Sequence, residues 1–190
     1  MPLLRSNLHA HTTWSDGVRS PERLVHEYEA LGYDFLAITD HWDHENMVAQ
    51  DYARALDALT SDMVLFPGVE LEHIRLSQHV GKVVGDREAL FVLNHPARYR
   101  LSVEQTIERI GIIRAAGMPI EAVELTDTGL YRPVYDTEEI PVVKIATDDA
   151  HRPPHFGRAW IEVEAPRERD AILRAVRAGD FRVGFADRAP

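Results

Sequence analysis

The chain has 190 residues, of which 45% are hydrophobic and 27% are charged, an ordinary composition for a globular protein. This composition excludes a collagen, a coiled coil and wholesale disorder, and the length predicts one domain over residues 1–190. The absence of cysteine excludes disulfides, thiolate metal sites and a cysteine nucleophile. No apolar stretch approaches the roughly 20 residues of a membrane helix. We therefore expect a cytoplasmic protein without a membrane partner.

The charge of the chain is strongly acidic. There are 31 acidic and 21 basic residues, which give a formal net charge of −10. An overall negative field repels a phosphate backbone and argues against nucleic acid as a partner. A carboxylate cluster that binds divalent cations would reverse this field locally. The ten histidines of the chain make such a cluster worth seeking.

Helical and extended patterns alternate along the chain. Ser20 and Pro21 are typical of a helix start and Gly32 of a helix end, which predicts a helix over 21–31. Ser102 and Gln105 form a capping-box pattern that begins a helix over 103–116. Further helices are expected over 46–60 and 167–178, and strands over 34–39, 63–69, 80–84, 90–93, 120–125, 142–147, 160–163 and 181–183. The alternation predicts an α/β fold with a largely parallel sheet.

Polar side chains able to bind metal follow the apolar strands. In parallel α/β folds this edge of the sheet is where loops bring ligands from several strands together. The pattern therefore predicts one shared site. Its members are His9, His11, Asp40, His41, Glu70, His95, Asp149 and His151.

Two short motifs have the spacing of paired ligands. His9 and His11 are two residues apart, so on an extended segment both imidazoles point to the same face. Asp149 and His151 repeat this spacing with one oxygen and one nitrogen ligand. Imidazole and carboxylate ligands without thiolate suit Zn²⁺, Mn²⁺ or Fe²⁺. There are more such ligands here than one ion needs.

In order and spacing these residues resemble the polymerase and histidinol phosphatase (PHP) superfamily of metal-dependent hydrolases. The resemblance covers nearly the whole chain and includes the small phosphoesterases of the family. Asp148 stands where the family's last motif has a serine. The matching segments are His9-Ala10-His11-Thr12 with Ser15-Asp16-Gly17, Ile38-Thr39-Asp40-His41, Gly68-Val69-Glu70, Asn94-His95-Pro96, Asp148-Asp149-Ala150-His151 and Gly157-Arg158-Ala159-Trp160.

The resemblance implies a distorted (β/α)₇ barrel with two or three divalent ions, Mn, Zn or Fe, at its C-terminal mouth. Glu70 would bridge the first two ions. The implied ligands are His9, His11, Glu70 and Asp149 for the first ion, Glu70, His79 and His95 for the second, and Asp16, His41 and His151 for the third. His73 is a nearby competitor for the position of His79.

Further residues are assigned to the catalytic centre and to the substrate. We expect Asp40 and the implied ligand His41 to belong to the catalytic centre. Asp40 would either orient a ligand histidine or cap a turn. Arg98 and Arg158 are candidates for substrate phosphate, with a surface ion pair as the alternative. A metal-bridging hydroxide would be the nucleophile at neutral pH. A small phosphate ester, such as a nucleotide or sugar phosphate, is the expected substrate because so short a chain leaves little room for a lid.

Three other functions compete with this hypothesis. The same metals could serve a hydrolase of carboxylic or carbamate esters. The chain could be a PHP module that serves a polymerase as an accessory part. An amidohydrolase-type barrel also begins with two such histidines but uses a bridging lysine. Only Lys82 and Lys144 are available, and Glu70 fills the bridging position better.

Overall fold

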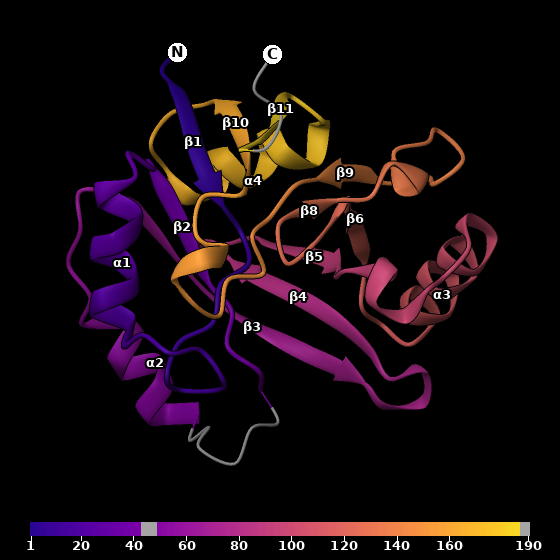
Figure 1. Cartoon of the computed structure of the whole chain (residues 1–190), viewed down its shortest axis with the longest axis horizontal. Helices are drawn as coiled ribbons and strands as arrows, with labels where there is room; N and C mark the ends of the chain where they lie inside the picture. Colours follow the sequence, from indigo (N-terminus) through magenta and orange to yellow (C-terminus); the bar gives the residue numbers. More distant parts are fainter. Residues whose placement is uncertain (43–48, 187–190) are drawn as a thin grey trace.

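The computed structural model describes residues 1–42 and 49–186. In this part of the chain, nine strands form one sheet that curves into a nearly closed barrel, and β7 and β8 form a small separate hairpin (Figure 1). The order across the large sheet is β11-β10-β1-β2-β3-β4-β5-β6-β9. Its strands are β1 (Leu3–Asn7), β2 (Phe35–Ile38), β3 (Val64–His73), β4 (Gln78–Val84), β5 (Ala89–Leu93), β6 (Ile120–Glu124), β9 (Val143–Ile145), β10 (Ala159–Glu164) and β11 (Phe181–Phe185). The hairpin strands are Thr126–Asp127 and Leu130–Tyr131, and the α-helices are α1 (Pro21–Ala30), α2 (Ala49–Asp57), α3 (Val103–Ala115) and α4 (Arg169–Ala178).

The sheet is less parallel than the sequence predicts. Strands β1, β2 and β3 run parallel, as do β5, β6 and β9. Strand β4 is antiparallel to both neighbours, and β10 is antiparallel to β1 and β11. Only residues 74–77 and 85–88 connect β4 to its neighbours, and a parallel crossover needs a dozen residues or more. The pairing with β4 also carries β3 past Glu70 to His73, beyond the predicted strand end.

The predicted helices are present with small shifts at their ends. The capping box at α3 is formed, since Ser102 and Gln105 each accept a hydrogen bond from the other's backbone N–H. Helix α2 (Ala49–Asp57) lies within the predicted 46–60 helix and ends three residues before the predicted end, and residues 46–48 lie outside the described residues. Strand β1 was not predicted, because its buried Ser6 and Asn7 hide the apolar pattern of a core strand. None of the helices described is long and apolar enough to cross a bilayer.

The barrel interior forms its own apolar core. All four residues of β2 are buried: Phe35 and Ala37 face the interior, whereas Leu36 and Ile38 pack outside against α1 and α2. The interior core also contains Ile172 and other apolar residues of α4, which closes one end of the barrel. Outside the barrel, on the side away from α1 and α2, helix α3 covers another apolar cluster (Figure 1).

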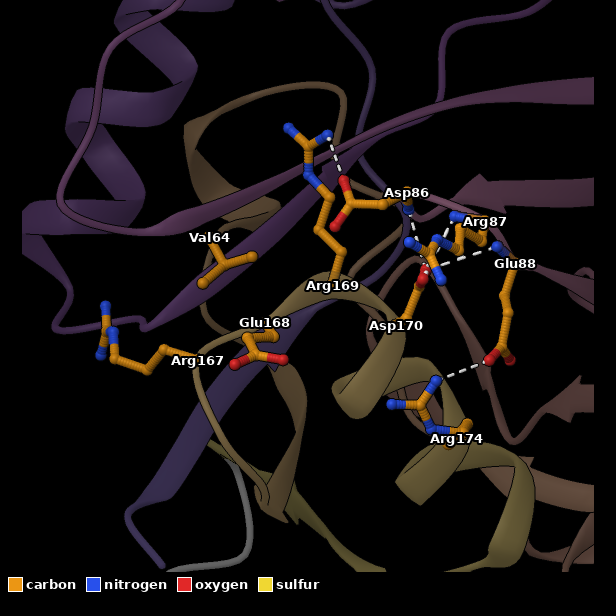
Figure 2. Close-up of a pocket in the computed structure, with 9 residues that line it drawn as sticks. All are labelled: Val64, Asp86, Arg87, Glu88, Arg167, Glu168, Arg169, Asp170 and Arg174. Atoms are coloured by element: carbon orange, nitrogen blue, oxygen red, sulfur yellow. Dashed lines mark hydrogen bonds and ion pairs between the residues drawn. The ribbon is translucent and has the colours of Figure 1, made fainter.

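Charged groups hold α4 at the closed end of the barrel. The carboxylate of Asp170 accepts hydrogen bonds from the backbone N–H groups of Asp86, Arg87 and Glu88, at 2.8–3.3 Å (Figure 2). Arg174 pairs with Glu88 at 2.7 Å beside a cleft of about 760 Å³. The lining of this cleft includes none of the nine candidate metal ligands. This end of the barrel is therefore held together by ion pairs and a helix terminus.

The packing of α4 gives a stability prediction. Ile172 is fully buried, so Ile172→Ala should lower the free energy of unfolding by about 2–5 kcal/mol. Ile112→Ala is the matched control, because Ile112 lies on α3 and is 41% exposed. Its cost should be within about 0.5 kcal/mol. Urea unfolding followed by circular dichroism measures both, and one cooperative transition would support the expectation of a single domain. Equal costs would show that α4 is not part of the main core.

Candidate metal centre

Two histidines leave the end of β1 toward the open end of the barrel. Ala10, between them, pairs with Ala150 in a short parallel bridge. The Nε2 atoms of His9 and His11 are 3.0 Å apart, and both side chains are buried. The alternation expected from their spacing therefore brings the two imidazoles to one point.

Glu70 lies at the centre of a ring of five imidazoles. Its carboxylate is 3.0–3.5 Å from a nitrogen of each, and it is buried together with the side chain of Asn94, which donates a hydrogen bond to Glu70 Oε1 at 2.7 Å. The imidazoles come from the ends of β1, β2 and β5 and from β4. They belong to His9, His11, His41, His79 and His95.

The bridge between Ala10 and Ala150 brings a second carboxylate to the same point. Asp149 Oδ1 is 3.5 Å from His9 Nε2 and 3.4 Å from His11 Nε2. Asp149 has a φ of 45°, and His95 has a φ of 28°. Such backbone costs about 1–3 kcal/mol for residues with a side chain and is concentrated at functional sites. Two candidate ligands thus sit on strained backbone.

An outer group lies beside the buried one. The potential ligand atoms of His11, Asp16, His41 and His151 lie within 4.8 Å of one another. Asp16 Oδ2 is 3.2 Å from His151 Nε2 and 3.7 Å from His41 Nε2. The Asp16 side chain is 43% exposed, so this group faces the mouth of the barrel.

The antiparallel direction of β4 places His79, and not its competitor His73, beside Glu70. His79 stands near the beginning of β4, at the same end of the barrel as Glu70, and His79 Nδ1 is 3.3 Å from Glu70 Oε2. His73 is the last residue of β3 and is not among the groups of clustered ligands. The structure therefore brings all nine predicted ligands together.

The donors fit bound cations. Glu70 Oε2 and Asp149 Oδ1 are buried oxygens without a hydrogen-bond donor, and His79 Nδ1 and His95 Nδ1 also lack a hydrogen-bond partner. Buried acceptors are almost always satisfied in folded proteins, so unpaired carboxylate oxygens among imidazoles mark places for positive charge. Nitrogen and oxygen ligands without sulfur are compatible with Zn²⁺, Mn²⁺ and Fe²⁺. The arrangement is that of a site for more than one ion.

The charges of the cluster shift its pKa values. Burial opposes ionisation of Glu70, but the neighbouring imidazoles, His9 above all, hold its pKa well below the usual range. Burial likewise opposes the charged form of His9, but the carboxylates of Glu124, Glu70 and Asp149 raise its pKa well above the usual value. Burial lowers the pKa of His41 to about 4, which leaves that imidazole neutral at neutral pH.

These shifts predict how metal binding depends on pH. The lowered pKa of Glu70 keeps it ionised at mild acidity, whereas the raised pKa of His9 means that a metal ion must displace a proton there. Bound metal should therefore decrease as the pH falls from neutral to about 4.5, well below the reference imidazole pKa of ~6.5. Elemental analysis after dialysis at the two pH values measures this. Unchanged metal content would contradict a site built on histidines.

The other predicted site residues have distinct surroundings. Arg98 contacts Asp149 Oδ2 and lies 3.5 Å from Asp127, with its side chain 34% exposed at the edge of the cluster. Arg158 donates a hydrogen bond to the Thr128 carbonyl in the β7–β8 turn. Arg98 thus stands beside the cluster, whereas the contact described for Arg158 is with backbone.

Asp40 anchors the loop that follows the first two histidines. Its carboxylate accepts hydrogen bonds from the backbone N–H and hydroxyl of Thr12 and from the Ser15 hydroxyl, each at 2.7 Å. Of the two roles considered for Asp40, these bonds match the turn cap. They hold the loop that carries Asp16.

Glu124 is a site residue that the sequence reasoning missed. It is the last residue of β6, is buried, and lies 2.7 Å from His9 Nδ1. The potential ligand atoms of His9, His95 and Glu124 are also within 4.8 Å of one another. The rule of polar residues at strand ends, applied to the predicted strand 120–125, would have found it.

Comparisons with known proteins agree with this geometry. A family model described as PHP-associated matches residues 143–181, which contain Asp149, His151 and α4. The "5'-3' exoribonuclease Rnm" of Salmonella typhimurium is 35% identical over 105 residues, 54% of this chain and 33% of that protein. The "DNA polymerase/3'-5' exonuclease PolX" of Bacillus subtilis is 30% identical over 79 residues, 36% of this chain and 14% of that protein. This chain thus matches a third or less of the length of these relatives.

A solved structure shows the same fold. It is a two-domain protein from Bacteroides vulgatus, described as containing a predicted PHP-like metal-dependent phosphoesterase. The TM-score is 0.77 at 19% sequence identity, over 97% of this chain and 65% of the other. The expected α/β fold with a distorted barrel and a cluster at its mouth is therefore confirmed.

Proposed function

We propose that the chain is a metal-dependent phosphoesterase of the PHP superfamily that hydrolyses a small phosphate ester, such as a nucleotide or sugar phosphate. The observation that carries the proposal is the position of Glu70, which faces five imidazoles and keeps one carboxylate oxygen without a hydrogen-bond donor. A carboxylate so placed is suited to bridge cations.

The proposed ligands divide between three positions. His9, His11 and Asp149 would hold one ion with Glu70, and Glu70 would share a second with His79 and His95. Asp16, His41 and His151 would hold a third at the mouth. Ions bound there supply an activated water and positive charge for the attacked centre and the leaving oxygen.

The chain's own side chains would position the substrate. Arg98 stands beside the proposed cluster, in contact with Asp149 and near Asp127, and is part-exposed. A guanidinium donates parallel hydrogen bonds that match two phosphate oxygens. Asp40 would act indirectly, because its bonds to Thr12 and Ser15 hold the loop that presents Asp16.

The end of a nucleic acid is a second candidate substrate. The net charge of −10 argues against long nucleic acids. However, two relatives carry the names of an exoribonuclease and an exonuclease, so a terminal phosphodiester is a candidate alongside a free small ester. Hydrolysis of carboxylic or carbamate esters and a role as a polymerase accessory module are the remaining alternatives.

One experiment separates these functions. Protein stripped of metal is reconstituted with Mn²⁺ or Zn²⁺ and assayed on an aryl phosphate, an aryl carboxylester, mononucleotides and a 5'-labelled oligonucleotide. Metal-dependent release of phosphate from the small esters is the expected result. Preferential cleavage of the oligonucleotide would favour the nuclease, and turnover of the carboxylester alone would overturn the phosphoesterase. Metal binding without any turnover would favour the accessory module.

Arg98 gives a direct test of phosphate recognition. Arg98→Ala should lower kcat/KM for a phosphate ester by about 10- to 100-fold, because hydrogen bonds to charged groups contribute ~1.5–3 kcal/mol. Metal content should not fall, since the substitution removes a cation that contacts Asp149. Arg182→Ala is the control, on the exposed surface of β11. An unchanged kcat/KM for Arg98→Ala would remove Arg98 from the substrate site.

A further inference from the structure

Glu124 contacts two candidate ligands that come from different strands. Glu124 is the last residue of β6 and is 1% exposed. Its carboxylate contacts residues that follow the ends of β1, β5 and β9, namely His9, His95 and Thr147. Strand β6 pairs in parallel with both β5 and β9, so its last residue reaches the same end of the barrel as His95. The position is therefore a product of the sheet order.

One oxygen of Glu124 determines which ring nitrogen of His9 can serve as a metal ligand. Glu124 Oε1 is 2.7 Å from His9 Nδ1 and also accepts a hydrogen bond from the Thr147 hydroxyl at 2.5 Å. Because the carboxylate is an acceptor, Nδ1 of His9 carries the proton in this contact. Nε2 then faces Glu70 at 3.3 Å and Asp149 at 3.5 Å. A bond of this kind orients a ligand imidazole and raises its basicity.

The other oxygen holds the backbone of His95. Glu124 Oε2 accepts a hydrogen bond from the His95 N–H at 2.7 Å. The φ of His95 is 28°, a conformation that residues with side chains rarely adopt. From this backbone, His95 directs Nε2 to within 3.0 Å of Glu70 Oε1. One carboxylate thus supports a side chain of the first proposed position and the main chain of the second.

We propose that Glu124 is a positioning residue that couples the two buried metal positions by fixing the His9 tautomer and the His95 backbone. This inference rests on the proposed function for its metals. The potential ligand atoms of Glu124, His9 and His95 are close enough together to share one ion. However, both oxygens of Glu124 already accept hydrogen bonds. These bonds give it the role of a support rather than of a ligand.

The test compares three variants of the full chain. In Glu124→Gln, one of the two oxygens becomes an N–H donor, so either His9 or His95 loses its acceptor. Glu124→Asp keeps the charge on a shorter side chain. Glu121→Gln is the matched control, since Glu121 stands on the same strand and pairs with Arg177 at 2.6 Å. Each variant is titrated with Mn²⁺ against a chelator, and ¹⁵N spectra of the histidine rings report the His9 tautomer in the Zn²⁺-loaded protein.

For Glu124→Gln we expect affinity for Mn²⁺ to weaken by about 10- to 100-fold, at unchanged stoichiometry under saturating metal, with an altered His9 ring signal. Partial recovery in Glu124→Asp and wild-type affinity in Glu121→Gln are expected as well. Wild-type affinity of Glu124→Gln would overturn the positioning role and leave the phosphoesterase standing. Loss of a whole equivalent at saturating metal would also overturn it, because Glu124 would then be a ligand. If the wild-type chain bound no metal, the proposed function itself would fail.

Discussion

Asp149→Ala should abolish hydrolysis and remove bound metal from the protein. Asp149 is a buried carboxylate near His9 and His11, and one of its oxygens has no hydrogen-bond donor. Removing it leaves the first proposed position with a single carboxylate and two imidazoles. We expect a loss of at least one metal equivalent and a fall in kcat of about 10³-fold or more, of the order seen when groups that stabilise transition-state charge are lost. Elemental analysis and the phosphatase assay measure the two effects.

Two further variants make the result specific. His9→Ala should have the same effects, because His9 belongs to the same proposed position. His26→Ala is the control, since His26 is exposed on α1 and should leave metal content and activity unchanged. Circular dichroism of each protein without metal shows whether the fold is intact. A folded Asp149→Ala protein with full metal content would contradict the assignment of Asp149 as a ligand.

The sequence predicts those parts of the structure that depend on interactions between residues close together in the chain or on the common direction of neighbouring strands. The N-cap at Ser20 and the capping box at Ser102 mark two helix starts, and the strand-end rule finds the buried cluster around Glu70. These signals act within a few residues or follow from the common direction of neighbouring strands. The predictions therefore hold for the helices and for the end of the barrel at which the candidate ligands meet.

The features that escaped prediction depend on partners far away in the chain. The direction of β4, which brings His79 to Glu70, follows from short links and from pairing with β3 and β5. Strand β1 carries a polar Asn7 whose partners, Tyr28 and Asp148, come from α1 and from the segment that follows β9. The hydrogen bond that Glu124 accepts from His9 joins residues 115 positions apart. No local pattern contains such contacts.

Glu70→Gln should release more bound metal than substitution of any residue in the outer group does. The substitution keeps the shape of the side chain and an oxygen that can accept the Asn94 hydrogen bond, but it removes the charge shared by five imidazoles. If Glu70 bridges two ions, both buried positions should weaken together. We expect a loss of more than one equivalent and a fall in kcat of about 10³-fold or more.

His151→Ala provides the contrast that makes this test sharp. His151 faces Asp16 at 3.2 Å in the outer group, and its side chain is 19% exposed. Its loss should release only the outer equivalent and leave the buried pair of ions bound. Stepwise titration with Mn²⁺, followed by elemental analysis of the saturated proteins, counts the equivalents in each variant. If Glu70→Gln lost no more metal than His151→Ala, Glu70 would serve a single ion, and its proposed role in holding two ions would have to be abandoned.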